Sequence, residues 1–271
     1  MVNNESRILF LGTAGDSLVM GKQLRACGGI FVETEDLQFL INPGPGSLVR
    51  ARQYNVNPRE LDALLISENT LLEASDANTI IDAMTNGGLD TKGVIICAPN
   101  VLEGTKNYHP AISPYHKKCV EKIIALKEGD KVAMNSVEVR PMRTKGRNED
   151  NVGFQIYTPS FTLGYVGNTG YQKQIAEQYK GVDILIVNVP HIIKKTQTDL
   201  FIEDAIKLIS DAKPQLAILT HVGIKMLESD LLTLVRQVQR ETNVQTIMAK
   251  EGMVIDPKSY SATQRQKKLI V

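Results

Sequence analysis

The apolar residues in the first 166 positions fall into short runs that predict β-strands. Residues 7–12 form a compact apolar run that ends at a glycine, and residues 61–67 form a run typical of a buried strand. Residues 29–33 and 37–41 flank a three-residue polar segment, a pattern that predicts a β-hairpin. Further strands are expected at residues 94–97, 120–126, 131–134, 137–141, 152–157 and 161–166.

Helical spacing and loop signals interrupt these strands at a few places. Ile80, Ile81 and Met84 lie on one face of a helix predicted over residues 74–84, and the glycines that follow end it. Residues 42–46 (NPGPG) predict a loop, since their two prolines fit neither a helix nor a central strand. Residues 100–115 are expected to form an irregular insertion, and residues 144–151 a charged loop.

The later part of the chain alternates between strands and helices. Helices are expected at residues 172–179, 202–211 and 224–241, and strands at residues 183–189, 217–220, 244–248 and 253–255. This order predicts two sheets that pack face to face, with helices outside. We find no repeat and no linker, so a single domain is expected over residues 1–258, followed by a polar tail at residues 259–271.

Composition narrows the class of protein. With 271 residues, of which 42% are hydrophobic, the chain can bury a sizeable core. The net charge of +1 argues against general nucleic-acid binding, and no apolar run approaches the about 20 residues of a membrane helix. The start, Met1 to Arg7, has no apolar signal core, and Cys27, Cys97 and Cys119 are too far apart to suggest disulfides or a Cys-type zinc site. A cytoplasmic protein is expected.

Six segments, taken in order, resemble the metallo-β-lactamase superfamily, and most closely its archaeal and bacterial metallo-hydrolase-like members. The resemblance spans roughly residues 7–256 and implies a four-layer αββα sandwich. The segments are RILFLGTAG (7–15), INPGPG (41–46), LLISENTLLEASD (64–76), GYVGNTGY (164–171), ILIVNV (184–189) and LAILTHVGIKML (216–227).

In that family a Ser-His-x-His-x-Asp-His loop, a later His, the Asp of a Gly-Asp-Thr turn and a late His hold two metal ions, commonly zinc. In this chain Ser67 is in place, and His221 is the only position that keeps the family's ligand type. The later His position falls on Thr144, with Gly146 as the alternative. The positions that match family ligands are Glu68, Thr70, Leu72, Glu73, Thr144, Asn168 and His221.

These replacements change the chemistry that the resemblance implies. Leu72 cannot ligate a cation, Thr70 offers a weak neutral oxygen, and Asn168 carries no charge with which to bridge two cations. We therefore expect the dinuclear site to be absent and no cofactor to bind. The alternative is a single divalent cation (zinc, manganese, iron or magnesium) on Glu68, Glu73 and His221.

Structural interpretations of the same residues stay open. His221 could be a hydrogen-bonded residue at a strand end, and Asp76 could cap the helix that follows it. A carboxylate in the pocket could instead pair with a base from Lys22, Arg25, Arg143 or Lys145. His109, His116 and His191 are expected to be polar loop or surface residues. Cys27 and Cys97 are expected in the core, with Cys119 partly exposed.

Two functions are compatible with these residues. The first is a non-catalytic binding or regulatory homologue of metal-dependent hydrolases. The alternative is a hydrolase acting on an ester or phosphodiester through an altered single-metal site, or through metal-free chemistry with Glu68 or Glu73 as general base and His221 as its partner. No residue identifies a partner, so a homo-oligomer and a protein partner both stay open, and no membrane association is expected.

Overall fold

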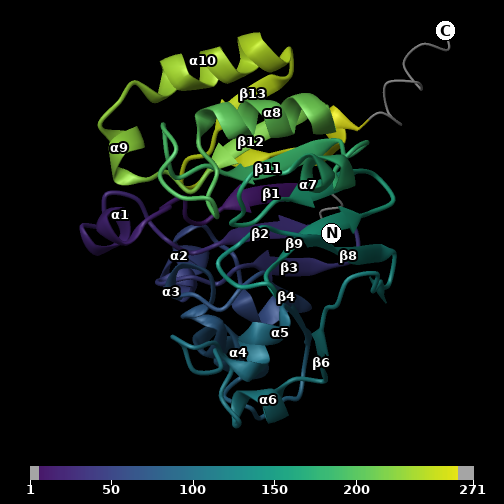
Figure 1. Cartoon of the computed structure of the whole chain (residues 1–271). Helices are drawn as coiled ribbons and strands as arrows, with labels where there is room; N and C mark the ends of the chain where they lie inside the picture. Colours follow the sequence, from purple (N-terminus) through teal and green to yellow (C-terminus); the bar gives the residue numbers. More distant parts are fainter. Residues whose placement is uncertain (1–5, 262–271) are drawn as a thin grey trace, which may run out of the picture.

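Two β-sheets packed face to face form the centre of the molecule (Figure 1). The computed structural model describes residues 6–261, and within them each sheet has seven strands. The first sheet has the order β14-β1-β2-β3-β4-β5-β6, and the second has the order β13-β12-β11-β10-β9-β8-β7. With helices on the outer faces, this arrangement confirms the α/β sandwich of the metallo-β-lactamase type.

The strands follow the apolar runs of the sequence closely. Those of the first sheet are β1 (Arg7–Phe10), β2 (Ile30–Glu33), β3 (Gln38–Ile41), β4 (Ala63–Ile66), β5 (Val94–Cys97), β6 (Lys122–Ala125) and β14 (Val254–Ile255). Those of the second sheet are β7 (Val132–Met134), β8 (Val137–Arg143), β9 (Val152–Tyr157), β10 (Thr162–Tyr165), β11 (Ile184–Asn188), β12 (Leu216–Thr220) and β13 (Gln245–Met248).

Strand direction places several loops at the same edge. In the first sheet β3, β4, β5 and β6 are parallel, and in the second β10, β11, β12 and β13 are parallel. Parallel strands have their carboxyl ends at the same edge of a sheet. The loop after β4 therefore lies at that edge of the first sheet, and the loops after β10, β11 and β12 lie together at that edge of the second. These four loops contain Glu68, Asn168, Pro190 and His221.

The helices cover the two outer faces. In Figure 1, α8 and α10 lie above the second sheet, and α2 and α4 lie beside the first. Alanine, leucine and isoleucine side chains of α8 pack on the outward residues of β11 and β12, such as Leu185 and Leu219. The helices are α1 (Ser17–Gly21), α2 (Ser47–Gln53), η1 (Pro58–Glu60), α3 (Leu71–Ala74), α4 (Ala77–Thr85), α5 (Pro99–Glu103), α6 (His116–Cys119), α7 (Lys173–Gln178), α8 (Ile202–Ala212), α9 (Ile224–Leu227), α10 (Leu231–Thr242) and η2 (Pro257–Tyr260).

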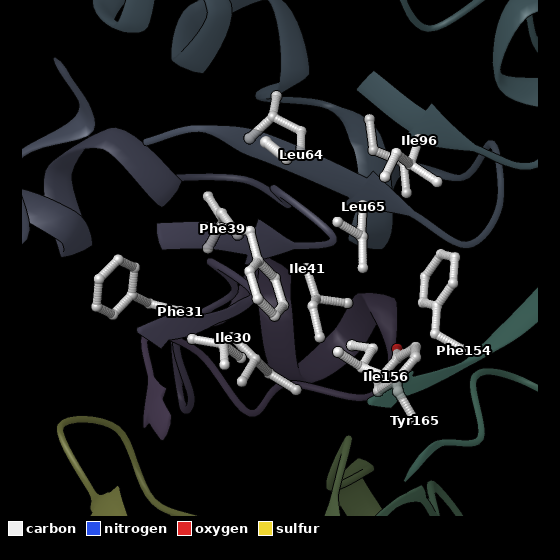
Figure 2. Packing of buried hydrophobic residues seen from close by; sticks show 14 of the residues in the cluster. Ile30, Phe31, Phe39, Ile41, Leu64, Leu65, Ile96, Phe154, Ile156 and Tyr165 are labelled. Atoms are coloured by element: carbon white, nitrogen blue, oxygen red, sulfur yellow. The ribbon is translucent and has the colours of Figure 1, made fainter. Parts of the chain in front are cut away.

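The main hydrophobic core fills the space between the sheets (Figure 2). Ile41 and Leu65 of the first sheet face Phe154 and Ile156 of the second, and all four are at most 1% exposed. Tyr165 belongs to the same core, but its hydroxyl group lies where the core meets the polar residues at the strand ends. Packing of this kind holds the two sheets, and therefore their loops, in fixed relative positions.

Two expectations about elements need correction. The helix expected over residues 224–241 is two helices, because the Asp230 carboxylate accepts hydrogen bonds from Leu232 N and Thr233 N and starts a new helix. The strands expected at 120–126 and 131–134 are confirmed as β6 and β7, which belong to different sheets. The insertion expected at 100–115 is not wholly irregular, since α5 (Pro99–Glu103) overlaps it.

The polar tail expected from residue 259 onward is partly helical in the described residues. Ser259 and Tyr260, expected in a polar tail, belong to η2, while residues 1–5 and 262–271 lie outside the described residues. Cys119, expected to be partly exposed, is only 4% exposed. In residues 6–261, no helix combines the length and the apolar character that crossing a membrane requires.

Candidate functional site

Four of the residues that match family ligands meet at the strand ends. Glu68 follows β4, Glu73 lies on α3, Asn168 follows β10 and His221 follows β12. Asn168 Nδ2 donates hydrogen bonds to Glu68 Oε1 and, at 3.0 Å, to Glu73 Oε1. His221 Nε2 lies 2.7 Å from the same Glu73 oxygen. We call these four residues, together with Asn151, the polar cluster.

Asn151 completes the cluster from the loop before β9. Its Nδ2 donates to Glu68 Oε2 at 2.6 Å, so both oxygens of the Glu68 carboxylate accept a hydrogen bond from an asparagine side chain. Asn100 Nδ2 in turn donates to Asn151 Oδ1 at 2.8 Å and fixes the orientation of that amide. Sequence reasoning missed both asparagines because it assigned Asn151 to a charged loop and Asn100 to an insertion.

Tyr165 and two further asparagines support the cluster from below. Tyr165 Oη accepts from Asn42 Nδ2 at 2.8 Å and from Asn188 Nδ2 at 3.0 Å. Asn188 Nδ2 also donates to Asn168 Oδ1 at 3.0 Å, and Asn42 Oδ1 accepts from the backbone N–H of Ser67 at 2.8 Å. These contacts fix the Asn168 side chain in one orientation, with its NH₂ group toward the two carboxylates.

The two buried glutamates have opposite electrostatic environments. Burial, together with the facing Glu73 carboxylate, raises the pKa of Glu68 to about 7. Burial also opposes the ionisation of Glu73, but the charge and hydrogen bond of His221 outweigh it and hold the pKa of Glu73 below its ordinary value. Like charges this close are not both favoured, so Glu73 carries the negative charge and Glu68 takes up a proton first.

Three of the positions that match family ligands do not join the cluster. Thr70 precedes α3, and its buried hydroxyl group makes no hydrogen bond among the described residues. Leu72 packs against the small apolar group of Ala14, Val19 and Cys27. Thr144 donates instead to the carbonyl of Asn151, at 3.0 Å.

Gly146, the alternative to Thr144, lies directly against the polar cluster. A Cβ atom on Gly146 would be 2.7 Å from Asn151 Nδ2 and 3.1 Å from the carbonyl oxygen of Asn168. A side chain at position 146 would therefore enter the cluster, whereas the hydroxyl group of Thr144 points to backbone. Of the two alternatives, position 146 is therefore the one that faces the polar cluster.

His221 has an unusual backbone conformation. Its φ angle is +57°, in the left-handed region that few residues other than glycine adopt. Gly15 permits this geometry, because a Cβ atom there would lie 1.8 Å from the carbonyl oxygen of His221. The backbone of the loop at residues 12–15 therefore packs directly against the His221 backbone, and Gly15 N donates to the carbonyl of Val222 at 3.1 Å.

The other charged residues considered from the sequence act elsewhere. Asp76 does not cap α4 through its side chain; its Oδ2 accepts from Gly46 N at 2.9 Å, at the start of α2. Arg25 pairs with Glu251 at 3.0 Å, and Arg143 pairs with Glu128. The base that faces a buried carboxylate is therefore His221, and neither arginine takes that role.

A cleft of about 340 Å³ opens above one side of the cluster. Glu68 and Asn168 lie at its base, whereas Glu73 and His221 are not among its lining residues. His191, expected to be a polar loop or surface residue, lies in the loop after β11, lines the cleft and is mostly buried. The wall is rich in hydroxyl, amide and charged groups: Asp16, Ser17, Thr70, Thr105, Asn107, Tyr108, Arg147, Asn148, Lys195, Thr196, Thr198 and Asp199.

The residues present do not fit a pair of metal ions. A ligand must direct a lone pair at the cation, but Asn151 and Asn168 direct N–H groups at the Glu68 carboxylate. Across residues 6–261, no three His, Cys, Asp or Glu side chains are grouped so that they could hold a metal ion. The amide hydrogens of Asn151 and Asn168 provide the positive ends of dipoles in front of the Glu68 oxygens.

Comparison with known proteins gives consistent results. Residues 38–222 match the β-lactamase superfamily domain. The chain is 30% identical over 254 residues to the uncharacterized protein MJ1374 of Methanocaldococcus jannaschii. This match covers 92% of this chain and 94% of MJ1374. The metallo-β-lactamase fold protein YhfI of Bacillus subtilis superposes with a TM-score of 0.77 at 16% identity, over 93% of this chain and 99% of YhfI. A diphosphatase of the PhnP family superposes with a TM-score of 0.67 at 14% identity, over 93% and 96% of the two chains.

Proposed function

Because the chain belongs to the β-lactamase superfamily, we propose that it is a member in which asparagine amides have replaced the metal ions, and which acts by binding rather than by hydrolysis. It is then a non-catalytic homologue of metal-dependent hydrolases. Its cleft binds a small polar molecule, and the bound state has a regulatory or scaffolding role.

One observation carries this proposal: the Glu68 carboxylate accepts from two asparagine amides. A buried carboxylate needs either a cation or hydrogen-bond donors. In this chain the donors are built into the fold by Asn100 and Asn188, which orient Asn151 and Asn168. Binding a cation at Glu68 would require both amides to turn away and lose these supporting contacts.

The cleft supports a binding function for a polar ligand. Its base offers the Glu68 carboxyl group, and its wall offers hydroxyl groups and side-chain amides that can both donate and accept. The hydroxyl of Thr70 is buried in this wall without a hydrogen-bond partner among the described residues, so a ligand atom there would satisfy it.

Metal content tests the proposal directly. The protein, prepared without a histidine tag or chelator, is incubated with zinc, manganese, iron or magnesium, desalted and measured by elemental mass spectrometry. We expect near-zero metal per chain under every condition. About two ions per chain would show that the amides turn away and would overturn the proposal.

A hydrolase acting on an ester or phosphodiester with a single metal ion is the second candidate. It is favoured by the contact between Glu73 and His221, two residue types that bind divalent metals, and by the similarity to the diphosphatase. About one tightly held ion per chain, lost in both Glu73→Gln and His221→Ala, would support this candidate over the first. The Asn107→Asp variant, at the exposed rim of the cleft, is the matched control and should leave metal content unchanged.

A further inference from the structure

Exposed apolar side chains surround the mouth of the cleft. Leu71, on α3, and Tyr108 line the cleft themselves. Leu18 lies on α1 next to a residue of the cleft wall, and Ile193 lies in the loop after β11, whose neighbouring residues also line the cleft. The four side chains are between 39% and 77% exposed. Large apolar side chains on a surface are usually scattered singly, so a group of them around one cleft indicates an interaction surface.

The segments that carry these side chains are also basic. We call them the rim segments, and they are residues 17–24, 70–72, 105–109 and 190–196. They contain no acidic residue, and they contain four lysines, all exposed: Lys22, Lys106, Lys194 and Lys195. The rim segments therefore carry a charge of +4, in a chain whose net charge is +1. Apolar and positively charged side chains thus share the face of the molecule on which the cleft opens.

The acidic residues next to the rim segments are engaged inside the cleft wall. Asp16 accepts from the backbone N–H of Val19 at 2.8 Å and from that of Ile224 at 2.8 Å, at the starts of α1 and α9. The Asp199 side chain is 11% exposed, and it accepts from Thr196 Oγ1 at 2.7 Å. The lysines, in contrast, are exposed, so the outer surface of this face is positive.

We propose that the rim segments dock the protein on a membrane surface that contains anionic lipids. The leucine, isoleucine and tyrosine side chains enter the boundary between headgroups and acyl chains, and the lysines contact lipid phosphates. Because the cleft opens between these segments, docking turns its mouth toward the headgroups. The sequence led us to expect no membrane association, since net charge and the length of apolar runs do not register a surface assembled from four separate segments.

The chemistry of the rim segments favours lipid over other partners. Leu18, Leu71 and Ile193 have no ring to stack on a base, and the chain contains no tryptophan, so single-stranded nucleic acid is disfavoured. Lysine is depleted in interfaces between proteins but is attracted to anionic lipid. The helix α1 protrudes from the body of the molecule on the left of Figure 1, where a flat surface can reach it.

Co-sedimentation of the untagged full chain with vesicles tests the proposal. We expect binding to vesicles of equal amounts of phosphatidylcholine and phosphatidylglycerol, little binding to phosphatidylcholine alone, and weaker binding at high salt. Affinity should fall at least about tenfold in the Leu18→Gln/Ile193→Gln variant. It should fall at least about fivefold in the Lys194→Gln/Lys195→Gln variant.

Matched controls change exposed residues outside the rim segments. Leu89 and Leu232 are 81% and 55% exposed, and the Leu89→Gln/Leu232→Gln variant should bind like the wild type. Lys131→Gln, at an exposed lysine between β6 and β7, should do the same. Circular dichroism and thermal unfolding show that each variant is folded, which is expected because all of these side chains lie on the surface.

The following results would overturn the proposal. They are no binding to the anionic vesicles at low salt, equal binding by the wild type and Leu18→Gln/Ile193→Gln, and an equal loss in the leucine controls. Tighter binding to a single-stranded RNA oligonucleotide than to the vesicles, or a dimer in light scattering that Leu18→Gln/Ile193→Gln abolishes, would assign the face to another partner. The proposal does not rest on the function proposed for the cleft, because neither metal content nor catalysis enters these measurements.

Discussion

His221 Nε2 and Glu73 Oε1 lie 2.7 Å apart although 148 positions separate the two residues in the chain. Glu73 is 1% exposed, so the imidazole contacts a carboxylate that water does not reach. Asn168 donates to the same oxygen. Both residues are of types that bind divalent metals, but in this chain the two side chains contact each other instead.

Removing His221 should destabilise the protein strongly. The His221→Ala variant removes from the buried Glu73 the side chain that lies 2.7 Å away, and we expect a loss of about 3 kcal/mol or more in the free energy of unfolding. His221→Asn should lose less, because asparagine adopts the left-handed backbone conformation readily and can still donate. Urea unfolding at pH 7.5 measures both, and equal stability of wild type and His221→Ala would contradict the role of the pair.

The Asn168→Asp variant restores the residue type of the family's Gly-Asp-Thr turn. Without a metal it adds a third carboxylate and removes the amide that donates to Glu68 and Glu73. We expect a destabilisation of about 3 kcal/mol or more at pH 7.5, less at pH 5. Asn107→Asp, exposed on the cleft rim, is the control and should change stability by less than about 0.5 kcal/mol. A stable Asn168→Asp protein would mean that the amide is dispensable.

Stability should fall as the pH rises from 5 to 8 because of Glu68. Its pKa rises from the ordinary 4.5 to about 7 on folding, so the folded chain holds this proton more tightly than the unfolded chain. The contribution is complete below pH 4.5 and is lost as the pH passes through about 7. The slope approaches about 1.4 kcal/mol per pH unit within that window. Glu73, whose pKa is lowered, acts in the opposite sense and only below its ordinary value.

The Glu68→Gln variant isolates this effect. Glutamine does not titrate, so the difference in unfolding free energy between the variant and the wild type should change with pH across 5–8. Contributions from His191 and other groups are common to both proteins and cancel. Urea titrations at several pH values give this difference, and a difference that is constant with pH would show that Glu68 keeps an ordinary pKa when folded.

Gly15→Ala should lower the stability of the protein by displacing the backbone of His221. The new Cβ atom would meet the carbonyl oxygen of His221 at 1.8 Å, so the loop or the histidine backbone must move. We expect a loss of about 2 kcal/mol or more. Gly21→Ala is the control, since no atom lies within 4 Å of its Cβ position, and it should be neutral or slightly stabilising. If the two variants unfold at the same urea concentration, the close approach of Gly15 has no energetic importance.

Strands were predictable from this sequence because their signal is local. The runs at β1, β4, β11 and β12 are almost wholly apolar, as strands buried on both faces require. The assignment of β6 and β7 to different sheets could not be derived from the sequence, because each is the last strand of its sheet and its place depends on which sheet edge the other strands leave free. The break between α9 and α10 was readable in principle from Asp230, a preferred residue at helix starts.

The site was only partly predictable for a related reason. Glu68, Glu73, Asn168 and His221 were found through the order of family motifs, and the structure brings all four together. Asn151 and Asn100 were missed because a lone asparagine in a loop gives no signal until its partner is known. The sequence left Thr144 and Gly146 as alternatives, because the directions of the side chains at these positions are set by β8, β9 and the loop between them.

The parallel strand ends that build the site have a consequence for synthesis on the ribosome. Glu68 and Glu73 emerge in the first third of the chain, but Asn151, Asn168 and His221 follow only much later. Until then the first sheet cannot complete the environment of its two glutamates, and its inner face has no second sheet to cover it. Stable burial of the inner face of the first sheet must therefore wait for the second half, so we expect the nascent chain to expose apolar surface over much of its translation.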